Sequence, residues 1–182
     1  MTKTAFKAAV LSLSFALAAP SAFSATIPAK PPGDAAPVTT MDRATFLKVL
    51  ASANAFEIQS SRIAREKSRS AEISHVAEMI IADHTKAADR LKATLTGKGV
   101  PIPPATLSPK LKTMIDQLNA ADSKVFDRLY LDMQAQAHQE AVALFRTYAG
   151  TGDDQELAGF ARETLPSLET HLAHVTRLVA QG

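Results

Sequence analysis

The chain has 182 residues with seven glycines, no cysteine and 20 basic against 18 acidic residues. The lack of cysteine excludes disulfides, thiolate metal sites, iron–sulfur clusters and cysteine nucleophiles. No glycine-rich phosphate-binding motif occurs, and the length fits one domain with some additional chain.

Residues 1–24 have the pattern of a secretory signal peptide. Two lysines precede the apolar run Ala8–Ala19, and Ala22 and Ser24 place small residues before the expected cleavage site. The run is shorter than the roughly 20 apolar residues of a membrane-spanning helix, although an uncleaved anchor is the alternative. We therefore expect a periplasmic protein without a transmembrane segment after cleavage, with outer-membrane association as a further option.

Residues 25–40 form a proline-rich stretch of small and polar residues, which predicts a disordered linker. Cleavage of the signal removes Lys3 and Lys7 and no acid, so the remaining chain has equal numbers of basic and acidic residues. A neutral chain without a basic stripe gives no electrostatic reason to expect a nucleic-acid partner.

Residues 41–182 have apolar residues at helical spacing, which predicts an all-α domain. The spacing and the Gly-, Pro- and capping-type residues predict four long helices, at 42–68, 70–96, 122–149 and from Asp153 onward. Asp153 with Glu156 resembles a capping box at the start of the fourth helix.

The connection between the second and third helices is unusually long. It is rich in proline and contains a short helix that begins at Ser108-Pro109. Its reach of roughly 40 Å matches the length of a helix of about 27 residues, so it can cross the whole bundle. We therefore predict a ferritin-like four-helix bundle with a long crossover containing a short extra helix; a plain up-down-up-down bundle is the alternative.

Ionisable residues occur where the core should be. Glu57, His84 and His171 lie on the apolar stripes of their helices, and His138 borders its stripe without clearly entering it. All four lie about 13–24 Å from the same end of such a bundle. Because buried charges need partners or a metal, we predict a metal site made of Glu57, His84, His138 and His171. These donors suit a transition metal such as zinc, copper or iron; a metal-free polar network, with Glu57 paired to protonated His84, is the alternative.

No catalytic constellation is apparent, so we do not expect an enzyme. A ferritin-type di-iron centre needs two Glu-x-x-His motifs, but the single one in this chain, Glu72-x-x-His75, points away from the core. Asp83 flanks the apolar stripe of its helix, where it either orients His84 or faces solvent; we favour the second. Tyr130 and Tyr148 are expected to pack in the core with their hydroxyls at its rim.

Three segments resemble a known family: Asp83-His84-Thr85-Lys86-Ala87, Phe126-Asp127-Arg128-x-Tyr130 followed by His138, and Leu165-Pro166-x-Leu168-x-x-His171-Leu172. Together they are similar to a bacterial secreted family of unknown function, whose members are often labelled outer-membrane or membrane proteins. The resemblance covers about residues 41–179. It implies a ferritin-like fold, an envelope location and no established enzymatic activity.

Two functions fit these observations. The first is an envelope protein that handles metal or responds to envelope stress through the His/Glu cluster. The second is a non-catalytic interaction module whose exposed helices bind an envelope protein partner. The sequence leaves the oligomeric state open.

Overall fold

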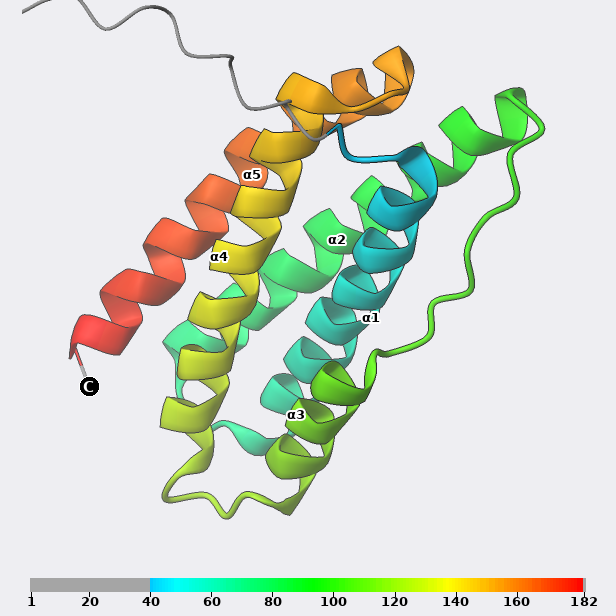
Figure 1. The fold of residues 1–182 in the computed structure, drawn as a ribbon. Helices are drawn as coiled ribbons and strands as arrows, with labels where there is room; N and C mark the ends of the chain where they lie inside the picture. The colour runs from blue at the N-terminus through cyan, green and yellow to red at the C-terminus, as the bar shows by residue number, and fades with distance from the viewer. Residues whose placement is uncertain (1–39, 182) are drawn as a thin grey trace, which may run out of the picture. The chain divides into compact units, whose positions relative to one another are not determined.

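The computed structural model describes residues 40–181, and in this range all regular structure is helical (Figure 1). This confirms the all-α fold. The predicted signal peptide and nearly all of the predicted linker lie outside the described residues. The helices are α1 (Arg43–Lys67), α2 (Ala71–Gly97), α3 (Pro109–Ala120), α4 (Phe126–Thr151) and α5 (Gln155–Gln181).

Side-chain caps fix where several helices begin. The Ser70 hydroxyl accepts from the Ile73 amide at the start of α2, and the Ser108 hydroxyl accepts from Leu111 at the start of α3. These oxygens satisfy amides that have no partner inside the helix. At the start of α5 the predicted cap was wrong by one residue. Asp154 accepts from the amides of Glu156 and Leu157, whereas Asp153 accepts from the Tyr148 hydroxyl.

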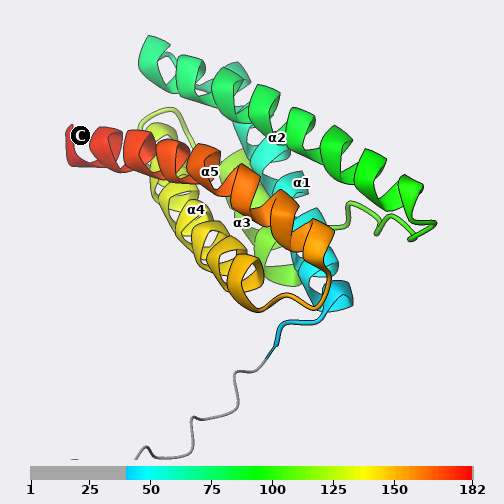
Figure 2. The same cartoon turned by 90° about the horizontal axis from the view of Figure 1, so that it is seen from above.

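The helices are connected as in the predicted ferritin-like bundle, with two hairpins joined by one long crossover. The pairs α1–α2 and α4–α5 are antiparallel hairpins, and α2 ends at the opposite end of the bundle from the start of α4 (Figure 1). The intervening segment crosses the bundle, and α3 packs against α1 and α4 (Figure 2). Gly99, just after α2, has a φ of 65°, which favours glycine at this turn.

The last part of the crossover differs from the prediction. α4 begins at Phe126 rather than Asp122, because Asp122 caps a separate turn. Its carboxylate accepts from the amides of Lys124 and Val125. An aspartate that bonds to nearby amides in this way offers the backbone an alternative to the helix.

The core consists of two apolar clusters with a polar layer between them. One cluster contains Phe56, Ile80, Leu118, Phe126, Tyr130 and Val175, among others. The other contains Phe46, Leu95, Phe145, Tyr148, Leu157 and Leu168, among others. Along α2, α4 and α5, the residues of one cluster give way to those of the other at His84, His138 and His171. The polar residues therefore lie near the middle of the bundle, at the depth that the sequence predicted.

Two expectations about the core were wrong. The helical spacing of the sequence places Val49 on the same apolar stripe as Phe46 and Leu50. In the structure Val49 is 45% exposed and Leu47 is buried in its place, because α1 packs against α2, α3 and α4 rather than against one neighbour. The Tyr130 hydroxyl does not reach the rim. It forms a hydrogen bond of 3.0 Å with the buried Ser61 hydroxyl, which satisfies it inside the core.

Between residues 40 and 181, no helix combines the length and the apolar character that a membrane span requires.

Candidate metal centre

Three histidines from three helices meet in the polar layer. His84 on α2, His138 on α4 and His171 on α5 each offer a ring nitrogen, and these nitrogens lie within 4.8 Å of one another. All three side chains are buried. His138 is fully enclosed, so the expectation that it only borders the core was wrong.

The hydrogen bonds of His138 and His171 define which nitrogen of each ring is free. His138 Nδ1 donates to the Gln134 carbonyl oxygen at 3.0 Å, and His171 Nε2 donates to the Asp83 carboxylate at 2.9 Å. Both partners are acceptors, so in the neutral rings the other nitrogen carries a lone pair. Those lone-pair atoms, His138 Nε2 and His171 Nδ1, face each other at 3.3 Å.

That separation matches the spacing of two ligands on one metal ion. Two nitrogens bound at about 2.0–2.1 Å in a tetrahedral arrangement lie about 3.3–3.4 Å apart. Two neutral rings with these tautomers have no proton to share across the gap. A cation held by these two residues would satisfy both lone pairs.

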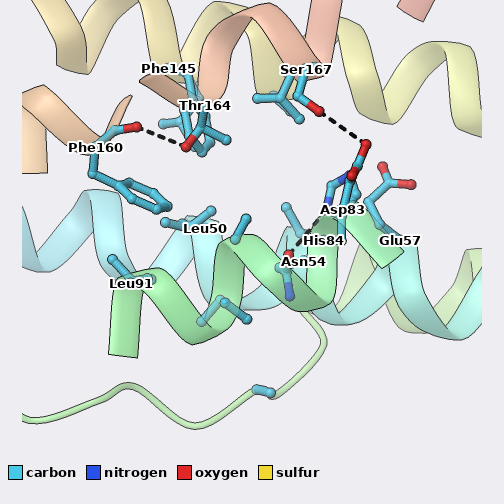
Figure 3. A pocket seen from close by; sticks show the side chains of 18 of the residues that line it. Leu50, Asn54, Glu57, Asp83, His84, Leu91, Phe145, Phe160, Thr164 and Ser167 are labelled. Carbon is cyan, nitrogen blue, oxygen red and sulfur yellow. Dashed lines mark hydrogen bonds between the residues drawn. The ribbon is translucent and has the colours of Figure 1, made fainter. Parts of the chain in front are cut away.

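His84 has the same arrangement. Its Nδ1 donates to Asn54 Oδ1 on α1 at 3.1 Å (Figure 3). Its Nε2 is buried and has no hydrogen-bond partner among the described residues. A buried polar atom without a partner is costly, and a metal ion shared with the other two histidines would satisfy it.

Burial keeps two of the three rings in their neutral form. It holds the pKa of His84 well below its usual range, and it lowers the pKa of His138 to about 4. The neighbouring imidazoles act in the same direction on both residues. These two rings are therefore neutral at pH 7, which is the form that coordinates metals.

Glu57 lies in the same layer, on the Nδ1 side of the His138 ring. Its Oε1 is 3.6 Å from His138 Nδ1, the nitrogen that donates to the Gln134 carbonyl oxygen. Its Oε2 is buried without a partner in residues 40–181, and burial raises the pKa of the carboxyl to about 8. The structure thus brings the three predicted histidines together and places Glu57 next to the cluster.

Three supporting groups hold the histidines, and the sequence identified only one of them. Asp83 was expected either to orient His84 or to face solvent; the structure places it against His171, so the favoured solvent-facing role was wrong. Asn54 lies one helical turn before Glu57 on the same face of α1, which is a usable signal. The Gln134 carbonyl has no signal in the sequence, because it is a backbone atom that meets His138 only through the ring's rotamer.

Comparison with solved structures gives the same fold. A DUF305 fragment from Deinococcus radiodurans has a TM-score of 0.67 at 16% identity, over 75% of this chain and 94% of that one. CopM in the Cu(II)-bound form has a TM-score of 0.66 at 17% identity, over 78% of this chain and 98% of that one. At such identities the likeness concerns the fold. A comparison with curated proteins finds no match.

A family model covers most of the sequence. It matches residues 28–178, a range that includes the three histidines and their supporting groups. The chain therefore belongs to the DUF4142 family, which is described as a domain of unknown function.

Proposed function

We propose that this protein binds one divalent transition-metal ion, with Cu(II) preferred, at His84, His138 and His171, and that it handles metal in the bacterial envelope. The observation that carries the proposal is the set of three buried histidines, each with one nitrogen held by an acceptor and the other free. Protein metal sites commonly orient their histidines in this way.

A metal-free hydrogen-bond network gives a partner to only two of the three ring nitrogens that face the cluster. A proton on His171 Nδ1 could bridge to His138 Nε2 while Asp83 balances the charge. That arrangement leaves His84 Nε2 buried without a partner. The metal accounts for all three nitrogens at once, so we favour it over the proton.

The preference for copper has two supports. Imidazole nitrogen suits copper, zinc and nickel, and among divalent ions of this series Cu(II) binds a given site most tightly. A Cu(II)-bound protein also adopts this fold, although its low identity does not place its copper at these residues.

The envelope location rests on the sequence. The charged start and short apolar run of residues 1–24 are typical of a secretory signal, and the resembled family is secreted and labelled as membrane-associated. An export assay of the full chain tests this part. Recovery of a shortened protein from the periplasmic fraction would support it, and retention of the full-length chain in the cytoplasm would contradict it.

Titration of the untagged, metal-stripped protein with Cu(II) and Zn(II) tests the metal site. We expect one ion per chain and tighter binding of Cu(II). His84→Ala and His171→Ala should each weaken binding by more than about 100-fold, since each removes a ligand rather than a group behind one.

His75→Ala is the matched control, because His75 is an exposed histidine on α2 outside the cluster. It should leave the titration unchanged. Circular dichroism of each variant checks that the helices are intact. Absence of stoichiometric metal, or equal losses in the His75 variant, would refute the proposal.

A further inference from the structure

A pocket of about 150 Å³ adjoins the histidine cluster. Helices α1, α2, α4 and α5 line it, and part of the crossover at Ile102 and Pro103 covers one side. Asp83, His84 and Glu57 gather at one end, whereas Leu50, Leu91 and Phe160 lie toward the other (Figure 3). The pocket therefore has a polar end at the histidines and an apolar end away from them.

Small side chains create the apolar space. Ala53 on α1, Ala87 and Ala88 on α2, and Ala141 on α4 line the pocket where larger residues would fill it. A cavity of about 150 Å³ with apolar walls is large enough to admit a benzene ring. The space thus fits a body of one ring or a short branched hydrocarbon.

The pocket reaches the cluster itself. His84 and His171 are among the residues that line it. Three histidines leave one coordination position of a tetrahedral ion for a ligand from outside the protein. A molecule in the pocket therefore lies against the side chains of two of the three proposed ligands.

We infer that this pocket binds a small molecule with an apolar body of about one ring and a single nitrogen donor that coordinates the metal. This inference rests on the proposed metal site and adds the class of its exogenous ligand. The donor completes the coordination at the polar end, and the apolar body displaces water from the alanine-lined end.

The test compares two probes on the Cu(II)-loaded protein, imidazole and 4-phenylimidazole, followed through the visible absorption of the copper. Both probes have the same donor, and only the second has an additional ring for the apolar end. Burial of a ring of this size should make 4-phenylimidazole bind about 10- to 100-fold more tightly.

Ala87→Leu fills the apolar end and should reduce that advantage to less than about threefold, with imidazole and Cu(II) affinities retained. Ala93→Leu is the matched control, an exposed alanine on the same helix outside this pocket, and should keep the advantage.

The outcomes separate the ligand pocket from the metal site on which it rests. Equal affinity of the two probes for the wild-type protein overturns this inference and leaves the metal site standing. Loss of the advantage in both alanine variants also overturns it, because the effect would not depend on the pocket. Failure of the wild-type protein to bind Cu(II) overturns both. If Ala87→Leu does not fold, the wild-type comparison decides alone.

Discussion

The hydrogen bond from His171 to Asp83 orients one ring of the histidine cluster. Asp83 is half exposed, but its carboxylate accepts from His171 Nε2 and also from the Ser167 hydroxyl. This contact fixes the ring so that Nδ1 points at His138. A carboxylate in this position also makes the imidazole a more basic ligand.

Asp83→Asn should therefore weaken Cu(II) binding by about 10- to 100-fold without loss of helix content. The amide keeps the shape of the side chain and removes its charge. Isothermal titration of the two proteins measures the difference. Asp89→Asn, an exposed aspartate on the same helix, should bind like the wild type, and an unchanged affinity in Asp83→Asn would contradict the role assigned to this carboxylate.

The buried ionisable residues predict how the metal-free protein responds to pH. His84 and His138 stay neutral when folded but take up protons when unfolded below pH 6.5, so acid destabilises the fold. Glu57 has the opposite effect. It is protonated in the folded protein up to about pH 8 but ionised in the unfolded chain above about 4.5, so its contribution to stability is lost as the pH rises between these values.

Between pH 4.5 and 6.5 the effect of His84 and His138 on stability outweighs that of Glu57. Of these three groups, only Glu57 still changes stability above pH 6.5. The free energy of unfolding should therefore peak near pH 6.5 and fall toward pH 8, by on the order of 1 kcal/mol per unit at most. Urea unfolding with a chelator present measures it. Glu57→Gln should remove the fall above pH 6.5, and a wild-type stability that keeps rising to pH 8 would show that Glu57 is ionised in the fold.

The sequence predicted part of this site. Glu57, His84 and His171 each interrupt the apolar stripe of their helix, and this pattern identified them from the sequence. All three are buried. The position of His138 was misjudged because α4 contacts three helices and buries a wide face. Part of that face is polar, with Gln134 next to His138, so a search for apolar residues cannot detect it.

At the scale of helices, one lysine ties the crossover helix to the bundle. Lys67, at the end of α1, donates from Nζ to the carbonyl oxygens of Leu118, Asn119 and Ala121 at 3.0, 2.7 and 2.6 Å. These carbonyls lie at the end of α3, where the helix leaves them without internal partners. A cation there also interacts favourably with the helix dipole.

Lys67→Met should lower the free energy of unfolding by about 1–3 kcal/mol, since it removes a charged donor and keeps the aliphatic chain. Lys112→Met is the matched control on α3. Its exposed pair with Asp116 should contribute only about 0.3–0.5 kcal/mol. Urea unfolding compares the variants, and equal losses would mean that Lys67 does not anchor α3.

The sequence predicts the start of a helix well where a single residue can cap it. Ser70 and Ser108 cap the helices that the sequence assigned to them. Asp153 and Asp154 were harder to separate, because adjacent aspartates offer the same cap. The choice depends on Tyr148, whose hydroxyl donates to Asp153 and leaves Asp154 to cap α5. That contact joins α4 to the turn before α5 and is not visible in the spacing of the sequence.

At the scale of the helical domain, residues 40–181, the fold places a polar layer between two apolar clusters. The clusters supply the burial that stabilises the bundle, and the layer between them concentrates most of its buried polar side chains. A buried layer with unpartnered atoms is destabilising unless something satisfies it. A bound metal would therefore stabilise the folded chain, by about 2.7 kcal/mol when its free concentration is 100 times its dissociation constant.

X-ray absorption spectroscopy of the protein loaded with one equivalent of Cu(II) tests the central claim most directly, because it identifies the atoms bound to the metal. We expect three imidazole nitrogens at about 2.0 Å and one exogenous ligand, and loss of one imidazole in His84→Ala. A coordination sphere of oxygen atoms without imidazole, or a spectrum unchanged in His84→Ala, would contradict the assignment of this layer as a metal centre.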